Sequence, residues 1–412
     1  MKKGIAILVG CLLLSGAAGF HFMQVKGMAL SQAGSCPALP PPTGTVIQVS
    51  SESTLRQLTQ NAAPGSNLML EPGVYAMQDF LYITVNGLAL RGASGNRDDV
   101  VLDFGGMLTG YFGILVDADD VTLADLTIRN AHDHGVSIQG RDRPLLYNLH
   151  ILDTNDQLVK VNPAGNGSED GLLACSRLEY TTSAPDDYTN GISAHQASRW
   201  VVRDNEWVRI RGLADVTGPT ILFWSESADT VVERNLLVDC YRGIAFGNSG
   251  HTGVDHTGGV VRNNMISFSL PHDTAIEMVH AQGWLVANNT ALLLDPSPGL
   301  TWGIEARFSD SQGHFAYNLT NLAILGDRDG ANSTLTGNLT SAQAGWFVDP
   351  AHADLHLGQS AVQAIDQALP LAQVSDDFDG QARPIGSAPD IGADEILLVD
   401  LDIQVYLPLA SR

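Results

Sequence analysis

The sequence predicts an all-β solenoid, and three observations support this fold class. Six apolar phrases of the type VVRDN each end on an asparagine, at intervals of 20 to 30 residues. Short phrases of the type GISA, in which apolar and small or polar residues alternate, lie between them. The chain has 42 glycines and only 16% charged residues, which suits short strands joined by many turns. A period of this length is typical of repeats that stack into one elongated unit.

The first 48 residues precede the repeat. Lys2 and Lys3 stand before an apolar stretch, so residues 1–30 are interpreted as a secretory signal. Anchoring as a lipoprotein at Cys11 is the alternative. The proline-rich residues 31–48 are predicted to form a linker. We expect a secreted or cell-surface monomer with no membrane span once the signal is removed.

One helix is predicted, over residues 53–62, where Leu55, Leu58 and Ala62 share one side and Pro64 follows. Two strands separated by a Pro-Gly turn are predicted next, in LMLEPGVY. A solenoid needs a cap over its first open core. The short helix is therefore expected to close the N-terminal end.

The asparagines that close the apolar phrases set the register of the repeat. They are Asn205, Asn235, Asn264, Asn289, Asn318 and Asn338, and the series is extended back through Ser176 and Asn148 to Asp125. A side-chain amide can bond backbone groups at a turn, and equivalent amides in adjacent coils can bond each other. We therefore interpret this ladder as structural and assign it no catalytic role.

The GISA-type phrases are predicted to be strands of successive coils. They cover residues 135–138, 158–161, 191–194, 220–223, 243–246, 275–278 and 303–306. Side chains of a strand alternate between its two faces. The apolar second and fourth residues should point inward, which leaves the first, third and fifth outward. The repeat is assigned to residues 49–395, and residues 396–412 form an apolar tail that covers the last coil or serves in sorting or anchoring.

Charge and cysteine content narrow the range of partners. The formal net charge of −23 disfavours nucleic acid and anionic membranes as partners. Beyond Cys11, the chain has Cys36, Cys175 and Cys240, an odd number without metal-type spacing. We interpret these three as small buried side chains and do not expect a disulfide framework.

The coil length, the ladder and the GISA-type phrases together resemble the right-handed parallel β-helix proteins of the pectate-lyase-like superfamily, over roughly residues 48–395. The segment STLRQLTQNAAPGSNLMLEPGVY is similar to the N-terminal cap of chondroitinase B-type and alginate-lyase-type enzymes. DFDGQARP and PDIGADE, in residues 377–395, are similar to an end motif of secreted bacterial β-helix proteins. The resemblance implies a right-handed parallel β-helix with a short N-terminal capping helix.

The same resemblance does not assign a reaction, because this fold carries many activities. The paired aspartates of β-helix polygalacturonases and the Tyr-Asp-His signature of alginate epimerases are absent. Residues 156–160, DQLVK, are only loosely similar to the lysine-bearing strand of chondroitinase B-type lyases. No catalytic residue of those families transfers cleanly.

The outward positions of the stacked strands define two columns of candidate site residues. The third positions are Ser137, Lys160, Ser193, Leu222, Ala245, Glu277 and Glu305. The fifth positions are Gln139, Asn162, His195, Trp224, Gly247, Val279 and Arg307. Adjacent coils lie about 4.8 Å apart. The register therefore predicts that His195 lies one coil from Lys160 on the neighbouring column, and that Trp224 lies one coil further on.

This arrangement suits a groove for a uronic-acid polymer. Lys160 or His195 is the candidate base for the C5 proton, and Arg242 or Arg307 is the candidate group that neutralises the sugar carboxylate. The candidate substrate-binding residues are Trp224, Glu277, Glu305, Gln139 and Asn162. A metal could instead neutralise the carboxylate.

Calcium is the cofactor considered, with Glu169 and Asp170 as candidate ligands. Three His/Asp clusters are further metal candidates, with polar turns as the alternative interpretation of each. They are residues 132–134, the set His251, Asp255 and His256, and residues 272–273.

The leading hypothesis is a secreted polysaccharide lyase that cleaves a uronic-acid-containing polymer by β-elimination. One alternative is a non-catalytic cell-surface protein that binds glycans. Another is a glycoside hydrolase in which Glu277 or Glu305 pairs with a second carboxylate.

Overall fold

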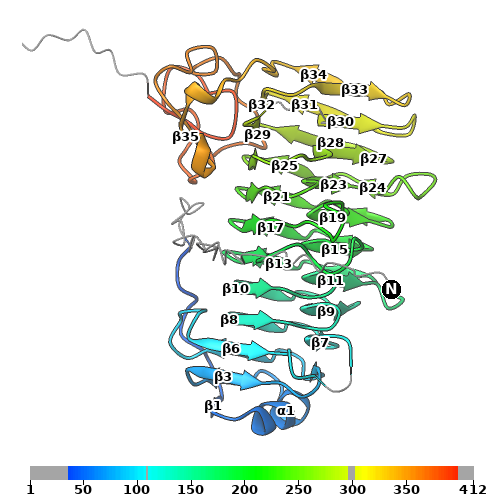
Figure 1. The fold of residues 1–412 in the computed structure, drawn as a ribbon, viewed down its shortest axis with the longest axis vertical. Coiled ribbons are helices and arrows are strands. Elements are labelled where there is room, and N and C mark those ends of the chain that lie inside the picture. The colour runs from blue at the N-terminus through cyan, green and yellow to red at the C-terminus, as the bar shows by residue number, and fades with distance from the viewer. Residues whose placement is uncertain (1–35, 108–109, 296–301, 398–412) are drawn as a thin grey trace, which may run out of the picture.

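A computed structural model describes residues 36–107, 110–295 and 302–397. Over these residues the chain winds into stacked coils of short parallel strands (Figure 1). The predicted fold class, an all-β parallel β-helix, is confirmed. The predicted signal, Cys11 and most of the apolar tail lie outside the described residues.

The helix at the N-terminal end is α1, Glu52–Asn61, one residue earlier than predicted at each end. The Ser51 hydroxyl caps it by accepting a hydrogen bond from the Thr54 amide at 3.3 Å. Leu55 is fully buried against the first coils, so the helix closes the core at this end (Figure 1). Among the described residues, no helix is long and apolar enough to cross a membrane.

The GISA-type phrases form a ten-stranded parallel sheet along one side of the described coils. In chain order its strands are β4 (Leu81–Ile83), β7 (Ile114–Val116), β9 (Val136–Gln139), β11 (Val159–Asn162), β15 (Ile192–His195), β19 (Ile221–Trp224), β23 (Ile244–Phe246), β27 (Thr274–Val279), β30 (Trp302–Arg307) and β33 (Ile324–Arg328). The predicted inward residues, such as Val159 and Val161 or Ile192 and Ala194, are fully buried. The outward columns are therefore in the predicted register.

The remaining coil strands form one continuous 24-stranded sheet within the described ranges. It contains β1 (Val46–Val49), β2 (Asn67–Leu70), β3 (Gly73–Ala76), β5 (Ala89–Gly92), β6 (Val100–Asp103), β8 (Thr122–Arg129), β10 (Leu145–Leu152), β12 (Ser168–Glu169), β13 (Leu172–Ala174), β14 (Arg177–Glu179), β16 (Ala197–Ser198), β17 (Val201–Arg203), β18 (Glu206–Val208), β20 (Ser227–Ala228), β21 (Val231–Glu233), β22 (Leu236–Val238), β24 (His256–Thr257), β25 (Val260–Arg262), β26 (Met265–Phe268), β28 (Ala281–Ala287), β29 (Thr290–Leu293), β31 (Gln312–Ala316), β32 (Leu319–Thr320) and β34 (Thr334–Thr336). β2 and β3 are the two strands predicted around the Pro-Gly turn.

The asparagine ladder forms as predicted from Asn205 to Asn338. Each asparagine Nδ2 donates to the Oδ1 of the asparagine in the next coil, at 2.8 to 3.0 Å. Ser176 extends the ladder by one coil, because its amide donates to the Asn205 Oδ1 at 2.9 Å. The ladder residues are almost fully buried from Ser176 to Asn318, where each unpaired amide would be costly.

The predicted extension of the ladder through Asn148 to Asp125 is wrong. The Leu149 amide donates to the Ser176 hydroxyl at 3.0 Å, so Leu149 holds the ladder position in that coil. Asn148 and Asp125 have φ angles of 49° and 60° and occupy the left-handed turn position one residue earlier. They bond to each other at 2.9 Å instead. Asparagine suits both positions, so residue type alone did not separate them.

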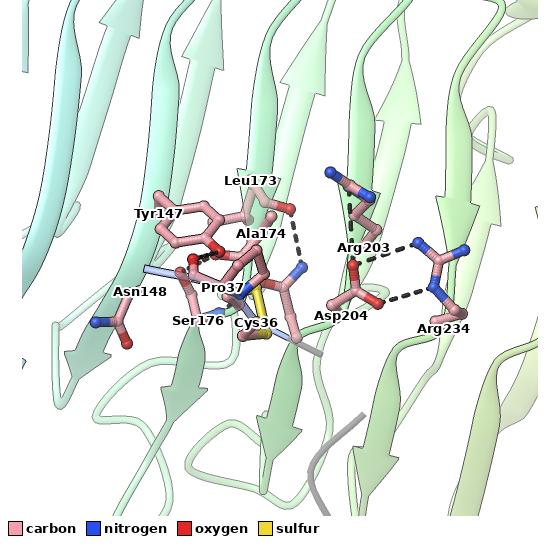
Figure 2. Close-up of a disulfide and its surroundings, with 12 residues drawn as sticks. Cys36, Pro37, Tyr147, Asn148, Leu173, Ala174, Ser176, Arg203, Asp204 and Arg234 are labelled. Carbon is pink, nitrogen blue, oxygen red and sulfur yellow. Dashed lines mark hydrogen bonds and ion pairs between the residues drawn. A yellow bond between two sulfur atoms is a disulfide. The ribbon is translucent and has the colours of Figure 1, made fainter. Parts of the chain in front are cut away.

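A disulfide joins Cys36 to Cys175, with 5.7 Å between their Cα atoms. This corrects the interpretation of the three cysteines as small buried side chains without a disulfide, and among the described residues only Cys240 is free, and it is buried. The backbone next to Cys36 is also held, since the Tyr147 hydroxyl donates to the Pro37 carbonyl at 2.5 Å (Figure 2). Arg91 donates to the Pro40 carbonyl at 2.8 Å. The described part of the proline-rich segment is therefore held against the coils by a disulfide and hydrogen bonds.

The chain after Asn338 folds into a C-terminal cap, drawn in orange to red in Figure 1. Its regular elements are η1 (Ala344–Trp346), β35 (Phe347–Asp349), η2 (Pro350–His352) and β36 (Asp354–Leu357). Arg383 lies at its centre with a side chain only 2% exposed, ion-paired to Glu395 at 2.5 Å. Arg234 reaches the cap from β21's side of the coils and binds Asp376 at 2.7 Å. The cap therefore packs against the side of the later coils.

Candidate functional site

Lys160 lies on the outward side of β11 but is 94% buried by its neighbours, with 6% of its surface exposed. Its Nζ atom is 3.0 Å from the His195 Nε2 and 3.3 Å from the Ser193 hydroxyl. Burial lowers the pKa of Lys160, while the nearby carboxylates of Asp156 and Asp133 act to raise it. The register predicted this contact between neighbouring columns of adjacent coils.

The neighbour His195 is a neutral imidazole near pH 7. Burial, followed by the charges of Lys160 and His251, lowers the pKa of His195 to about 4. A neutral imidazole has one nitrogen that accepts a hydrogen bond. The Nε2 of His195 is therefore suited to accept from the Lys160 amine.

An aromatic row continues from His195 along the solenoid axis. Trp224 on β19 pairs in register with His195, and their ring centroids are 4.3 Å apart. The indole of Trp224 also lies 4.7 Å from the ring of His251. The Nδ1 of His251 is 2.8 Å from Asp255, a buried carboxylate that also accepts the Ser225 and Asn248 amides. Lys160, His195, Trp224 and His251 thus form one continuous row.

An acidic pocket lies near Lys160, since the charges of its Asp133 and Asp156 act on the amine. It has a volume of about 350 Å³ and is lined by His132, Asp133, Asn155, Asp156, Pro185 and Asp186. Burial, together with the charge of Asp133, raises the pKa of Asp156 to about 7. Near neutral pH the Asp156 carboxyl therefore binds a proton readily, because burial and Asp133 disfavour its charged form.

Three residues at this pocket could hold a metal ion. One ligand atom from each of Asp133, His134 and Asp156 lies within 4.8 Å of the others. The His134 Nδ1 and the Asp156 Oδ1 are buried without a hydrogen-bond partner. Burial, then the charge of Lys160, lowers the pKa of His134 to about 3, so its ring is neutral and free to ligate. This set of donors fits a divalent cation.

Asp156 was not among the predicted site residues, although the sequence contains a signal for it. Asp133 stands three residues before Val136 and Asp156 three residues before Val159, at the start of two consecutive GISA-type phrases. Residues at the same point of successive coils become neighbours, and the Asp156 amide donates to the Asp133 carbonyl at 3.2 Å. Comparing positions before each strand, as well as on it, would have paired them.

The two candidate arginines do not reach Lys160. Arg242 precedes β23, three coils away, and binds Glu277 and Asp273. Arg307 on β30 is five coils away and pairs with Asp329 at 2.7 Å. At about 4.8 Å per coil these separations are about 14 and 24 Å. Neither arginine could contact a sugar whose C5 proton lies at Lys160.

Glu277 and Glu305 are neighbours in register, as predicted, and each is only 2% exposed. Burial raises the pKa of Glu277. Glu305 is ion-paired to Arg328 at 2.6 Å. A register irregularity between β30 and β33 brings Arg328 to this place, where its guanidinium also lies 4.1 Å from the Trp302 ring.

The remaining predicted site residues are Gln139, Asn162, Glu169 and Asp170. Gln139 donates to the Ser137 hydroxyl at 2.9 Å and lies one coil before Lys160, whereas Asn162, its partner in register, follows Lys160 by two residues on β11. Glu169 and Asp170, the candidate calcium ligands, are about half exposed and both bind Arg199. An arginine already neutralises them, so Asp133 and Asp156 are the stronger ligand pair.

The stacked coils define a parallel β-helix. No protein-family model matches the chain, and no curated protein matches it by sequence. Among solved structures, it is similar to pectate lyase Pel9A at a TM-score of 0.52 and 14% identity, over 86% of this chain and 96% of that one. It is also similar to the GH136 lacto-N-biosidase from Eubacterium ramulus, at a TM-score of 0.50 and 15% identity, over 72% and 68% of the two chains. Identities this low establish the fold alone.

Proposed function

We propose that this protein is a polysaccharide lyase that cleaves a uronic-acid-containing polymer by β-elimination. The single observation that carries the proposal is the buried amine of Lys160, held against neutral His195 beside an acidic pocket. The likeness to a pectate lyase fold supports the substrate class. Secretion and a monomeric state remain predictions from the sequence.

Lys160 is the base in this proposal. A base works best when its pKa lies near the working pH. His195, with a pKa of about 4, is too weak a base at neutral pH, whereas burial brings the pKa of Lys160 down toward that range. His195 is therefore a positioning residue that directs the amine, and Trp224 offers a ring face on which a sugar can stack.

In the reaction, the neutral Lys160 amine takes the proton from C5 of the uronic acid. The electron pair of the C–H bond forms the C4–C5 double bond, and the bond from C4 to the glycosidic oxygen breaks. The leaving oxygen takes a proton from water and becomes a hydroxyl, and the Lys160 ammonium releases its proton to the resulting hydroxide, which restores the base. A divalent cation held by Asp133, His134 and Asp156 would neutralise the sugar carboxylate and acidify the C5 proton.

The test is incubation of the purified protein with alginate, pectate, chondroitin and hyaluronan, with and without calcium. A lyase produces an unsaturated end group that absorbs ultraviolet light. The change Lys160→Ala should abolish this signal, whereas Arg307→Ala, a cation on the same sheet far from Lys160, should preserve it. Binding of a polymer without cleavage would instead support the glycan-binding alternative.

One observation favours a glycoside hydrolase as the second candidate. Glu277 and Glu305 are two buried carboxylates in adjacent coils, and paired carboxylates perform glycoside hydrolysis. Each is already ion-paired to an arginine, which ranks this candidate below the lyase. Hydrolysis would release reducing ends without ultraviolet absorbance, and Glu277→Gln would abolish it while Lys160→Ala would not.

A further inference from the structure

A second cluster of possible metal ligands lies in the C-terminal cap, apart from the ten-stranded sheet. His356 belongs to β36, Asp379 follows it by 23 positions, and Asp394 lies close to the end of the described chain. One ligand atom from each lies within 4.8 Å of the others. Three separate segments of the cap therefore converge on one point.

The imidazole of His356 is oriented as metal-bound imidazoles usually are. Its Nδ1 lies 2.6 Å from the Asp354 carboxylate. A carboxylate on one ring nitrogen fixes the tautomer and turns the other nitrogen toward a metal. The Nε2 of His356 is buried and has no hydrogen-bond partner, although Asp379 Oδ2 lies 3.2 Å away. Nε2 therefore faces the cluster and contacts Asp379 as an ion pair, which a metal ion between the two atoms would replace.

The two aspartates are held in place by the backbone. Asp394 is only 5% exposed, and one of its oxygens accepts the Leu357 amide at 2.7 Å. Asp379 sits in a turn that is closed when its own amide donates to the Asp377 carboxylate at 3.0 Å. Little rearrangement is needed to bring a carboxylate oxygen from each to a shared cation.

The charge around the cluster is strongly negative. The carboxylates that act on His356 are Asp379, Asp394 and Asp354, and Asp377 acts in turn on Asp394. The buried guanidinium of Arg383 is nearby, but its direct ion-pair partner is Glu395. The carboxylates thus outnumber the nearby positive groups, because the Arg383 guanidinium is already paired with Glu395. A divalent cation would reduce the repulsion between these carboxylates.

We propose that the cap binds one divalent transition-metal ion, through the Nε2 of His356 and one oxygen each from Asp379 and Asp394. Zinc is the best match, because one imidazole and two carboxylates suit it, whereas calcium and magnesium favour ligand sets made of oxygen. Asp354 is the positioning residue that orients His356. The ion would tie β36 to the terminal segment and stabilise the cap.

A proton is the competing occupant. Burial acts to lower the pKa of His356, but Asp379, Asp394 and Asp354 outweigh it and raise the pKa to about 9. An imidazolium would neutralise only one of the carboxylates. Zinc binding has to displace that proton, so the comparison between the two occupants is made at a fixed pH.

The experiment measures zinc stoichiometry and thermal stability of the full-length protein after removal of metals with a chelator. We expect zinc to raise the melting temperature and to bind one equivalent in the cap. His356→Gln should weaken this binding by about 10- to 100-fold or more and abolish the zinc-dependent rise. His352→Gln is the matched control, because His352 forms an exposed pair with Asp349 in the same cap. It should bind zinc like the unaltered protein.

Two further variants remove ambiguity. Asp156→Asn disables the separate cluster beside Lys160 and should leave the cap's zinc equivalent in place. Asp379→Asn changes a partly exposed ligand and serves if His356→Gln fails to fold. Measured in the Asp156→Asn background, zinc binding that is absent, or that survives both His356→Gln and Asp379→Asn, would overturn the proposal in favour of the imidazolium. None of these readouts depends on lyase activity, so the two proposals fail separately.

Discussion

At the scale of single residues, the environment of Lys160 decides what the site can do. Its amine is nearly buried and faces a neutral imidazole on one side and two aspartates on the other. The register of alternating phrases was enough to predict that Lys160 and His195 meet. The role of Asp156 escaped prediction because it precedes its strand, where the alternation of faces gives no guidance.

The first prediction concerns the amine itself. Lys160→Arg keeps the positive charge, but a guanidinium does not release its proton in proteins. We expect the rate of lyase turnover to fall by about 10²- to 10⁴-fold, with little change in melting temperature. In the unaltered protein, the rate should rise with pH as the amine loses its proton. A variant that keeps full activity would show that Lys160 is not the base.

The second prediction concerns pH-dependent stability at Glu179. Burial acts to raise its pKa, but hydrogen bonds from His150 and Arg177 outweigh it and lower the pKa to about 2, from an ordinary value of 4.5. A depressed pKa gives stability that is present above pH 4.5 and is lost as pH falls toward 2. Glu179→Gln should remove about 2–3 kcal/mol at pH 7 and flatten the acid limb of the unfolding curve. The exposed Glu226→Gln is the control, and equal acid sensitivity in both variants would refute this assignment.

At the scale of elements, the ladder and the strands were predictable where one local rule holds. Asn205 to Asn338 recur in the same phrase, and burial of alternate strand residues follows from period two. The rule failed where a local irregularity intervened. Arg328 pairs with Glu305 where the register of β30 with β33 shifts, and a bulge of this kind cannot be recognised from the spacing of the phrases.

The third prediction tests one step of the ladder. Asn264 is fully buried, and its amide nitrogen donates to Val232, Arg262 and Asn289 while its oxygen accepts from Asn235. Asn264→Ala leaves several buried polar groups without a hydrogen-bond partner. We therefore expect the free energy of unfolding, measured by denaturant titration, to fall by about 2–4 kcal/mol. Asn61→Ala, at the exposed end of α1, should change it by less than about 0.5 kcal/mol. Similar values for the two variants would contradict the structural role of the ladder.

At the scale of the whole molecule, the stacked coils could be predicted from the sequence. The disulfide and the ion pairs between residues far apart in the chain could not. Cys36 and Cys175 are 139 residues apart, and an odd cysteine count pointed away from a disulfide. Their pairing depends on the path of the proline-rich segment along the coils. The repeat pattern does not specify this path, because the segment lies outside the repeats. The cap is similar, since Arg234 reaches across 142 residues to Asp376.

The fourth prediction concerns the disulfide that holds the proline-rich segment against the coils. Cys36→Ser should release residues 36–45 from the coils and make them a site of limited proteolysis. Loss of a disulfide that closes a long loop typically costs about 2–4 kcal/mol, measurable in the absence of reductant. Cys36→Ser in the presence of reductant should match the reduced unaltered protein. An unaltered protein that reductant does not affect would show that the disulfide does not form in solution.

The amides of the ladder have one more property. In each amide–amide bond from Asn205 to Asn338, the donating Nδ2 belongs to the earlier coil and the accepting Oδ1 to the later one. Such a chain polarises along its length, because each amide that donates becomes a better acceptor for the one before it. The interior of the solenoid therefore has a direction as well as a period. A coil inserted in the middle would have to carry an amide of the same polarity, and a leucine in its place would divide one cooperative array into two shorter ones.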